Sequence, residues 1–254
     1  MMSQKHSKFD KLDPVTRAFA ETHPETCAAV TTTWQQKLYY SLLVFFLLFL
    51  LKYRWDLFVF LVCGVLMLLY AGAVLMRLIA GVYTVFGYGE ERVSSGELAA
   101  LSDKELPVYT ILIPLYKEPE VAQKILKRIA ALDYPSDKLD VKLLLESDDM
   151  ETYNELTKTH LPENFTIMRV PDAQPKTKPR ACNFGLREAR GEFCVIYDAE
   201  DIPDPDQLRK SVAVFRRDTS RRLACVQAKL NYYNSRQNWL TGFFTVEYTT
   251  YFDL

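Results

Sequence analysis

The chain has 254 residues, of which 31 are basic and 32 are acidic, and its formal net charge is −1. This balance excludes a protein that binds nucleic acid through a broad basic surface. Five cysteines without a CxxC pair exclude a disulfide framework and a structural zinc site, and they favour a reducing compartment. With only three histidines, histidine-based catalysis and histidine-based metal sites are disfavoured.

Residues 1–37 are polar and contain five lysines or arginines. A cleavable secretory signal would place its apolar core nearer the start, so we interpret this stretch as a cytosolic leader.

Two apolar segments follow, at residues 38–53 and 57–76, and we predict a transmembrane hairpin from them. The second has 20 residues without a charge, which suffices to cross a hydrocarbon core that needs about 20. The first has a shorter apolar run, which Trp34 and Tyr53 can extend at the membrane interfaces. The positive-inside rule places both termini in the cytosol. The alternative is a buried helical hairpin in a soluble protein.

Residues 77–88 are apolar and aromatic and predict an interfacial helix, and a charged linker continues to residue 106. From Pro107 onward, short β-rich segments alternate with helical patterns. This alternation predicts an α/β fold with a mostly parallel sheet and helices on both faces. The expected strands span residues 108–114, 141–145, 165–170, 192–197 and 223–226, and the expected helices 120–132, 152–158 and 180–189.

Charged residues follow the strands at the points where ligands bind in parallel sheets. The acidic ones are Glu118 after the first strand, Glu146, Asp148 and Asp149 after the second, and Asp198, Glu200 and Asp201 after the fourth. Lys176, Lys178 and Arg180 follow the third. Neighbouring carboxylates repel one another unless they share a cation, so we expect Mg²⁺ or Mn²⁺ here. The cations would face the phosphates of a metal-bound nucleoside diphosphate compound.

Each of these features alone has a simpler interpretation. An acidic run after a strand can be a solvated turn, the basic group can be an exposed loop, and Glu118 can simply favour a helix start. Their order on consecutive strand ends favours a shared site.

Three motifs and one shorter element carry a resemblance to a known family. Residues 113–118 are similar to an Ile-Pro-x-Tyr-Asn-Glu opening, with Lys117 in place of asparagine. Residues 178–183 resemble Lys-Ala-Gly-Ala-Leu-Asn. Residues 198–203 resemble Asp-Ala-Asp-x-x-Pro, with Glu200 at the second acidic position, and Gln227 resembles a Val-Gln element. Residues 107–254 thus resemble the first part of a processive, membrane-embedded family 2 glycosyltransferase of the cellulose synthase type, which implies a GT-A-type fold.

The resemblance also implies roles for the matching residues. Tyr116 and Glu118 would line the nucleoside pocket, and Glu146 stands where the family has an aspartate that binds the base, with Asp148 and Asp149 as its neighbours. Lys178 would approach the diphosphate, and Asn183 would shape that loop. Asp198 and Glu200 would hold the metal, with Asp201 as a substitute ligand because the register is ambiguous by one.

No catalytic residue is assigned. The family's Thr-Glu-Asp motif supplies the general base and its Gln-x-x-Arg-Trp motif binds the acceptor, and neither motif occurs in this sequence. Glu247 and Asp253 are the late acidic candidates, and we assign the base to neither. We therefore expect the N-terminal part of a larger enzyme, holding the donor-binding half. An aromatic helix at residues 243–254 is expected to meet the membrane interface.

The resulting expectation is an inverting glycosyltransferase at the cytoplasmic face of a bacterial inner membrane. It would transfer a sugar from a nucleotide-sugar donor, UDP-linked, to a growing polysaccharide or glycolipid. An alternative is a catalytically silent donor-binding subunit that docks a membrane partner through its hairpin. A nucleotidyl- or phosphotransferase is a further alternative, against which the lack of a phosphate-cradling glycine motif counts.

Overall fold

The computed structural model describes residues 14–23, 32–88, 90–174, 176–220, 222–230 and 232–252. The chain divides into two compact units. Residues 92–226, with a short N-terminal stretch, form the first, which we call the sheet unit. Residues 19–91 and 227–254 form the second, which we call the helical unit. Much of the predicted leader and Asp253 lie outside the described residues.

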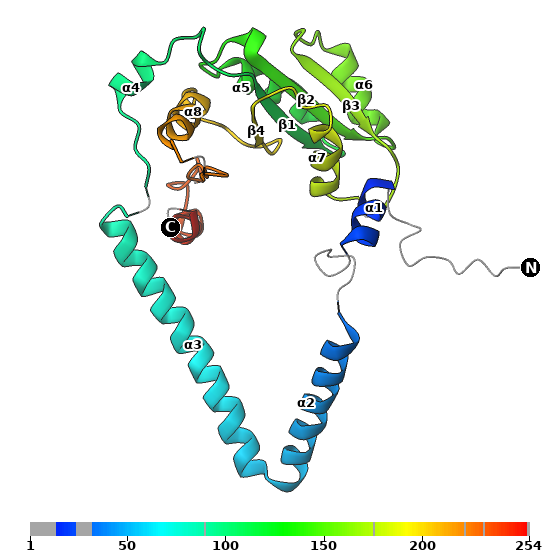
Figure 1. Ribbon diagram of the computed structural model, residues 1–254, viewed down its shortest axis with the longest axis vertical. Helices are drawn as coiled ribbons and strands as arrows, with labels where there is room; N and C mark the ends of the chain where they lie inside the picture. Colours follow the sequence, from blue (N-terminus) through cyan, green and yellow to red (C-terminus); the bar gives the residue numbers. More distant parts are fainter. Residues whose placement is uncertain are drawn as a thin grey trace, which may run out of the picture. The chain divides into compact units, whose positions relative to one another are not determined.

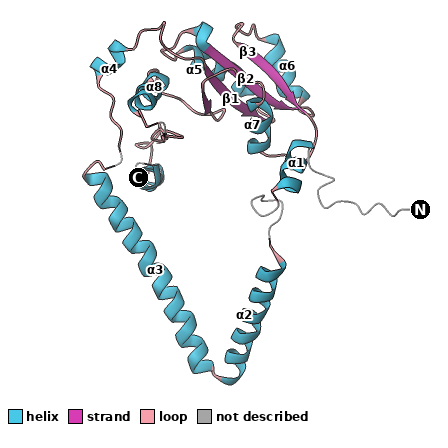
Figure 2. Ribbon diagram, viewed as in Figure 1, coloured by secondary structure: helices cyan, strands magenta, loops and turns pink. Residues whose placement is uncertain are grey.

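The elements are shown in Figures 1 and 2. The sheet unit contains α4 (Ser95–Ala100), β1 (Tyr109–Leu115), η1 (Pro119–Val121), α5 (Ala122–Ala130), η2 (Ser136–Lys138), β2 (Leu139–Glu146), α6 (Met150–Lys158), β3 (Phe165–Val170), α7 (Lys178–Leu186), β4 (Phe193–Ile196) and α8 (Gln207–Arg217). The helical unit contains α2 (Trp34–Tyr53), α3 (Trp55–Val85) and α9 (Trp239–Phe252), and α1 (Pro14–Thr22) begins the described chain.

The four strands form one parallel sheet in the order β3-β2-β1-β4. Tyr109 on β1 lies opposite Leu139 on β2 and Phe193 on β4, and Val141 on β2 lies opposite Phe165 on β3. The predicted mostly parallel sheet is therefore confirmed, and all four strands end at the same edge.

Helices cover both faces of this sheet, as the sequence predicts. Side chains alternate between faces along each strand, so neighbouring residues enter two different cores. One core joins the strands to α5, α6 and α8, and includes Ile111, Val141, Ile125, Leu156 and Leu208. The other joins them to α7 and includes Leu112, Leu144, Met168, Ala181 and Cys182. Burying one such aliphatic side chain contributes about 1.5 to 3 kcal/mol, so the two cores hold the strand ends in fixed positions.

Asp140 organises the opposite, amino-terminal edge of the sheet. Its buried carboxylate accepts hydrogen bonds from Thr110 Oγ1 at 2.9 Å and Arg190 N at 3.1 Å, and Lys142 Nζ lies 3.0 Å away. Gly191 N donates to Thr110 Oγ1 at 2.8 Å. Burial alone would raise the pKa of Asp140, but these donors outweigh burial and hold the pKa below its ordinary value. The network thereby joins the start of β4 to β1 and β2.

The predicted linker has structure of its own. Ser94 Oγ accepts a hydrogen bond from Glu97 N at 3.3 Å, and Glu97 Oε2 accepts one from Ser94 N at 2.8 Å, so a capping box begins α4. Glu97 Oε2 also accepts a hydrogen bond from Ser94 Oγ at 2.7 Å. This bond, the one from Ser94 N and the nearby guanidinium of Arg217 on α8 lower the pKa of Glu97 to about 2. Further along, Lys138 Nζ donates to the carbonyl oxygens of Asp103, Lys104 and Leu106 at 2.6 to 2.8 Å. The linker is therefore bound to the sheet unit.

Two segments differ from the prediction. Residues 77–85 continue α3 without a break, because this segment contains no proline and a helix tolerates the single glycine, Gly81. No separate interfacial helix therefore begins at Arg77. The strand expected at residues 223–226 is absent from the described part of this region. Leu223 N donates to Asp218 Oδ2 at 2.6 Å, so Asp218 holds this backbone in a turn.

The helical unit is apolar and exposed. Helices α2 and α3 have 20 and 31 residues and break only around Arg54, and both are long and apolar enough to cross a membrane. Their large apolar side chains are mostly exposed within the described structure, for example Phe60 at 72% and Leu68 at 76%. Water would oppose the exposure of so much apolar surface.

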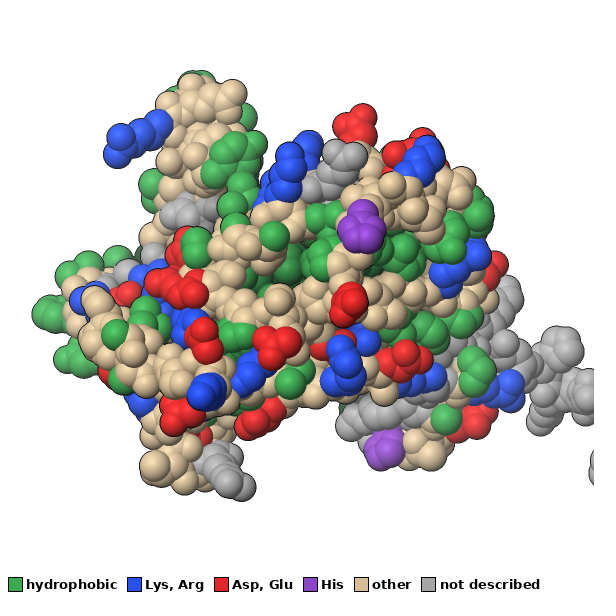
Figure 3. Space-filling model, turned by 90° about the horizontal axis from the view of Figure 1, so that it is seen from above, with side chains coloured by type: hydrophobic (Ala, Val, Ile, Leu, Met, Phe, Trp, Pro, Cys, Tyr) green, Lys and Arg blue, Asp and Glu red, His purple; other side chains and the backbone are tan. Residues whose placement is uncertain are grey.

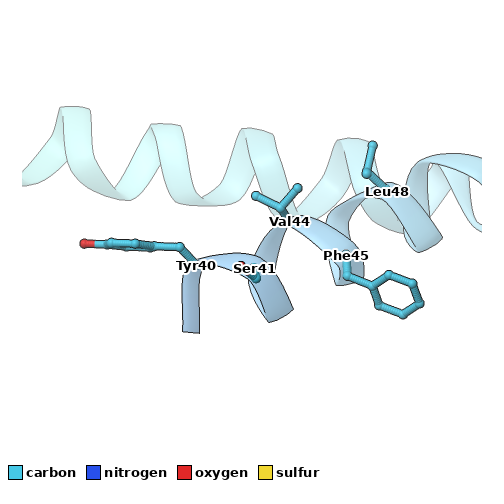
Figure 4. Close-up of a pocket in the computed structure, with 5 residues that line it drawn as sticks. All are labelled: Tyr40, Ser41, Val44, Phe45 and Leu48. Atoms are coloured by element: carbon cyan, nitrogen blue, oxygen red, sulfur yellow. The ribbon is translucent and has the colours of Figure 1, made fainter. Parts of the chain in front are cut away.

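A shallow groove lies on α2. Figure 4 shows that its lining residues, Tyr40, Ser41, Val44, Phe45 and Leu48, all come from this one helix. Ser41 Oγ donates to Lys37 O within the helix at 2.8 Å. The groove is thus part of the apolar outer surface of α2 and lacks the convergent polar groups of a ligand site.

Candidate functional site

Acidic side chains from three strand ends gather at the carboxyl edge of the sheet. Glu118 follows β1, Asp149 follows β2, and Asp198 and Glu200 follow β4. We call these four residues the carboxylate cluster. Asp149, Asp198 and Glu200 all repel the Glu118 carboxylate, and Lys178, at the start of α7, attracts it. Figure 3 shows that acidic and basic side chains also lie side by side over the face of the molecule seen from above.

The loop after β1 is fixed by the start of α6. Lys117 N donates to Asp149 Oδ2 at 2.5 Å, and Glu118 N donates to Thr152 Oγ1 at 3.0 Å. Asp149 also caps α6, because its Oδ1 accepts a hydrogen bond from Thr152 N at 3.1 Å. Tyr116, just before this turn, leaves 41% of its surface exposed at the edge. The turn therefore presents the Tyr116 ring and the Glu118 carboxylate at the edge of the sheet.

Lys117 adopts a left-handed backbone conformation, with φ at 57°. This conformation costs a non-glycine residue about 1 to 2 kcal/mol, and asparagine tolerates it better. The Lys117 ammonium lies 5.1 Å from the Tyr116 ring centroid, an exposed contact that stabilises by about 0.5 kcal/mol. We therefore expect Lys117→Asn to raise Tm by about 2 °C in calorimetry of the full chain. Lys127→Asn on α5 is the control and should lower Tm slightly. A Tm of Lys117→Asn equal to or below that of the unchanged chain would contradict backbone strain at Lys117.

Glu118 is the least satisfied member of the cluster. Its Oε2 atom is buried and has no hydrogen-bond partner within the described structure. Burial and the carboxylate of Glu200 raise its pKa above the ordinary value, Lys178 opposes this rise, and Asp198 and Asp149 add to it. A buried carboxylate oxygen in such surroundings is suited to accept a hydrogen bond or to bind a cation.

The loop after β4 is a closed turn. Asp198 N donates to Asp201 Oδ2 at 2.8 Å, and Asp201 N donates to Asp198 O at 3.0 Å. Arg128 Nη1 on α5 donates to Ala199 O at 3.0 Å. Lys178 Nζ lies 2.9 Å from Asp198 Oδ1. Because one Asp201 oxygen holds the turn, Asp198 and Glu200 are better placed than Asp201 to bind an external group.

Three further ion pairs connect the remaining loops. Arg180 Nη1 lies 3.3 and 3.2 Å from the two carboxylate oxygens of Glu146, and Arg180 Nη2 donates to Pro171 O. Lys176 Nζ lies 2.7 Å from Asp148 Oδ2 and 2.9 Å from Asp172 Oδ1. The ends of β2 and β3 and the start of α7 are thus held together by paired charges.

The donor set suits a hard divalent cation. Asp198, Glu200 and the unpartnered oxygen of Glu118 are carboxylate ligands of the kind that Mg²⁺ and Mn²⁺ prefer. In the described part of the chain, no three His, Cys, Asp or Glu side chains are placed to hold a metal ion together. Mg²⁺ commonly takes one or two protein carboxylates and completes its shell with phosphate and water. The residues present therefore fit a metal that binds together with a phosphorylated ligand.

The structure brings together several of the residues that the sequence singles out. Lys178, Asp198, Glu200, Glu118 and Asp149 act on one another electrostatically. Glu146 and Asp148 are held in separate ion pairs, and Asn183 lies exposed on α7. Their predicted binding roles stay predictions.

Two residues that build this edge had no predicted role: Thr152 fixes the β1 turn, and Arg128 fixes the β4 turn. Arg180 was expected to face the phosphates of a ligand, whereas its guanidinium pairs with the buried Glu146 carboxylate. Arg180 carried one available signal, because it stands where the resembling motif has glycine.

A sequence profile described as "Glycosyltransferase like family 2" matches residues 107–252. The chain belongs to this family. The matched region holds all four strands and the carboxylate cluster, so these features belong to a family 2 glycosyltransferase domain.

Two curated relatives illustrate the similarity. The chain is 29% identical over 147 residues to the probable glycosyltransferase YdaM of Bacillus subtilis (strain 168), with 57% of this chain and 34% of that protein covered. It is 28% identical over 150 residues to glucomannan 4-beta-mannosyltransferase 1 of Oryza sativa subsp. japonica, with 56% of this chain and 28% of that protein covered. The chain thus spans about a third of the length of these relatives.

Among solved structures, a mannosyltransferase from Pyrobaculum calidifontis in complex with GDP-Man and Mn²⁺ is similar with a TM-score of 0.43 and 24% identity. The match covers 65% of this chain and 46% of that one.

Proposed function

We propose that the family 2 domain binds a nucleotide-sugar donor at the carboxyl edge of its sheet, for transfer of the sugar with inversion to a growing polysaccharide or glycolipid. The observation that carries this proposal is the carboxylate cluster with Lys178 beside it. Four acidic groups from three strand ends need a cation, and a lysine beside them suits a diphosphate.

The site residues take distinct roles in this proposal. Tyr116 packs against the base, and Glu118 and Glu146 accept hydrogen bonds from the nucleoside, with Asp148 and Asp149 holding the surrounding loops. Lys178 binds the diphosphate, and Asn183 shapes its loop. Asp198 and Glu200 hold Mg²⁺ or Mn²⁺. When bound, the metal offsets the negative charge that grows on the leaving diphosphate.

We further propose that α2 and α3 cross a membrane. A helix that is apolar all round is either buried in protein or in a bilayer, and α2 and α3 are exposed. The hydrocarbon core of a bilayer needs about 20 residues, which both helices reach. Basic residues before α2 and after residue 76 favour cytoplasmic termini, as in a bacterial inner membrane, where the hairpin could also contact a partner subunit.

The donor proposal predicts a large effect of Asp198→Ala. We expect this variant to bind UDP at least tenfold more weakly than the unchanged chain in the presence of Mn²⁺, because a carboxylate at the metal is lost. The measurement is calorimetric titration of the full chain in detergent with UDP, with GDP as a second nucleotide.

Asp137→Ala is the matched control, because Asp137 is an exposed carboxylate of η2, before the amino-terminal end of β2. It should leave the affinity within twofold. Unchanged, Mn²⁺-dependent binding in Asp198→Ala would be strong evidence against a donor site at this edge.

A further inference from the structure

Lys178 occupies an unusual place for a lysine. It is the first residue of α7, where the positive end of the helix dipole disfavours a cation. Its ammonium nitrogen lies 2.9 Å from Asp198 Oδ1. The hydrogen bond to Asp198 raises the pKa of Lys178, burial opposes the rise, and Glu200 and Glu118 add to it. Carboxylates thus hold this ammonium in place against the dipole.

The ammonium uses an oxygen that a metal would need. Asp198 lies at the end of β4, and its backbone N–H and carbonyl close the turn with Asp201, so its backbone is held in place beside Lys178. A divalent cation at Asp198 Oδ1 would meet the Lys178 ammonium, which lies 2.9 Å from this oxygen, and repel it, so binding there displaces the ammonium. The displacement is feasible because the Lys178 side chain is 60% exposed and has a long flexible stem.

We propose that Lys178 competes with the divalent cation for Asp198, so that metal and nucleoside diphosphate bind in a coupled manner. This inference rests on the proposed donor site. When the metal binds alone, it must displace the Lys178 ammonium from Asp198, and the ammonium gains no new anionic partner. When a diphosphate arrives with the metal, its oxygens accept the displaced ammonium. By linkage, the diphosphate then strengthens metal binding by the same factor by which the metal strengthens diphosphate binding.

The test measures Mn²⁺ binding to the full chain in detergent, from the electron paramagnetic resonance signal of free Mn²⁺, with and without UDP. We expect Lys178→Met to bind Mn²⁺ alone about fivefold more tightly than the unchanged chain. We expect UDP to tighten Mn²⁺ binding about tenfold in the unchanged chain and less than threefold in Lys178→Met. Lys178→Arg, which keeps a positive charge beside Asp198, should not bind Mn²⁺ alone more tightly.

Lys176→Met is the matched control. It removes an ion-paired ammonium two residues away, but one that contacts Asp148 and Asp172 rather than Asp198. Its affinity for Mn²⁺ alone should stay within twofold of that of the unchanged chain. If Lys176→Met and Lys178→Met gain the same affinity for Mn²⁺ alone, the gain comes from the loss of a positive charge in general, and the proposed competition is wrong.

Failure of this inference can be told apart from failure of the proposed function. If Mn²⁺ promotes UDP binding and Asp198→Ala abolishes it, while Lys178→Met binds Mn²⁺ alone no more tightly, the donor site stands and the competition is wrong. If the unchanged chain and Lys178→Met bind neither Mn²⁺ nor UDP, the donor site itself is wrong and the competition fails with it.

Discussion

Replacing Arg180 by methionine is expected to lower the free energy of unfolding of the sheet unit by about 3 to 5 kcal/mol. Arg180 Nη1 lies 3.3 and 3.2 Å from the two carboxylate oxygens of Glu146, and both side chains are only 7% exposed. Methionine fills much of the space but brings no charge, so the Glu146 carboxylate would stay buried without its partner. The hydrogen bond to Pro171 O, at the end of β3, would also be lost.

The effect should be measured by hydrogen–deuterium exchange of the sheet-unit amides in the full chain. Tryptophan fluorescence would not report it, because Trp34, Trp55 and Trp239 all lie in the helical unit. The double variant Glu146→Met with Arg180→Met removes both charges and should recover most of the loss. Two results would contradict an energetically important buried pair. One is a loss of less than about 1 kcal/mol in the free energy of unfolding of Arg180→Met, and the other is a double variant as unstable as Arg180→Met.

Replacing Gly191 by alanine is expected to destabilise the sheet unit by about 3 kcal/mol. A Cβ atom at this position would lie 2.4 Å from Thr110 N and 2.5 Å from Phe193 O, which are backbone atoms that cannot turn away. It would also lie 2.8 Å from Thr110 Oγ1, which accepts the Gly191 N–H and donates to Asp140. The start of β4 must therefore move, and the Asp140 network must open.

Gly96→Ala provides the control for this prediction. A Cβ atom at Gly96 on α4 would meet only Ser94 Oγ, at 4.0 Å, so alanine should be neutral or stabilising by up to about 1 kcal/mol. The same exchange experiment compares both variants. If Gly191→Ala keeps β4 as protected from exchange as in the unchanged chain, the close approach to Thr110 does not exist in solution.

The regular elements of the sheet unit follow largely from sequence periodicity. The strands are apolar runs bounded by prolines, glycines and charged residues, and β3 coincides with the expected range 165–170. Helix α8 was not predicted, although Leu208, Val212 and Phe215 recur at helical spacing. The prediction of a strand at 223–226 was wrong, because composition cannot show whether a partner strand is within reach.

The site could be predicted as a set of strand ends but not as a set of contacts. Parallel strands bring their carboxyl ends to one edge, so the sequence sufficed to bring Glu118, Asp149 and Asp198 to that edge. It could not reveal that Arg180 neutralises Glu146 or that Asp201 closes the β4 turn, because such contacts depend on how loops approach in space. The left-handed conformation of Lys117 was equally hidden, since nothing in a lysine signals it.

The strand order has a consequence for how the chain folds. Within the sheet, β1 pairs on one side with β2, which follows it closely in sequence, and on the other side with β4, which comes after β2 and β3. Closing the longer loop costs more chain entropy, so a nucleus of β1 and β2 can form earlier than the pairing with β4.

Asp198 and Glu200 follow β4, whereas Glu118 and Asp149 follow β1 and β2. The carboxylate cluster is therefore complete only when the pairing of highest contact order has formed. A chain that has folded β1 to β3 alone presents half of the cluster and no Asp198 for Lys178 to contact. In this folding order, the carboxylate cluster assembles only when the sheet is finished.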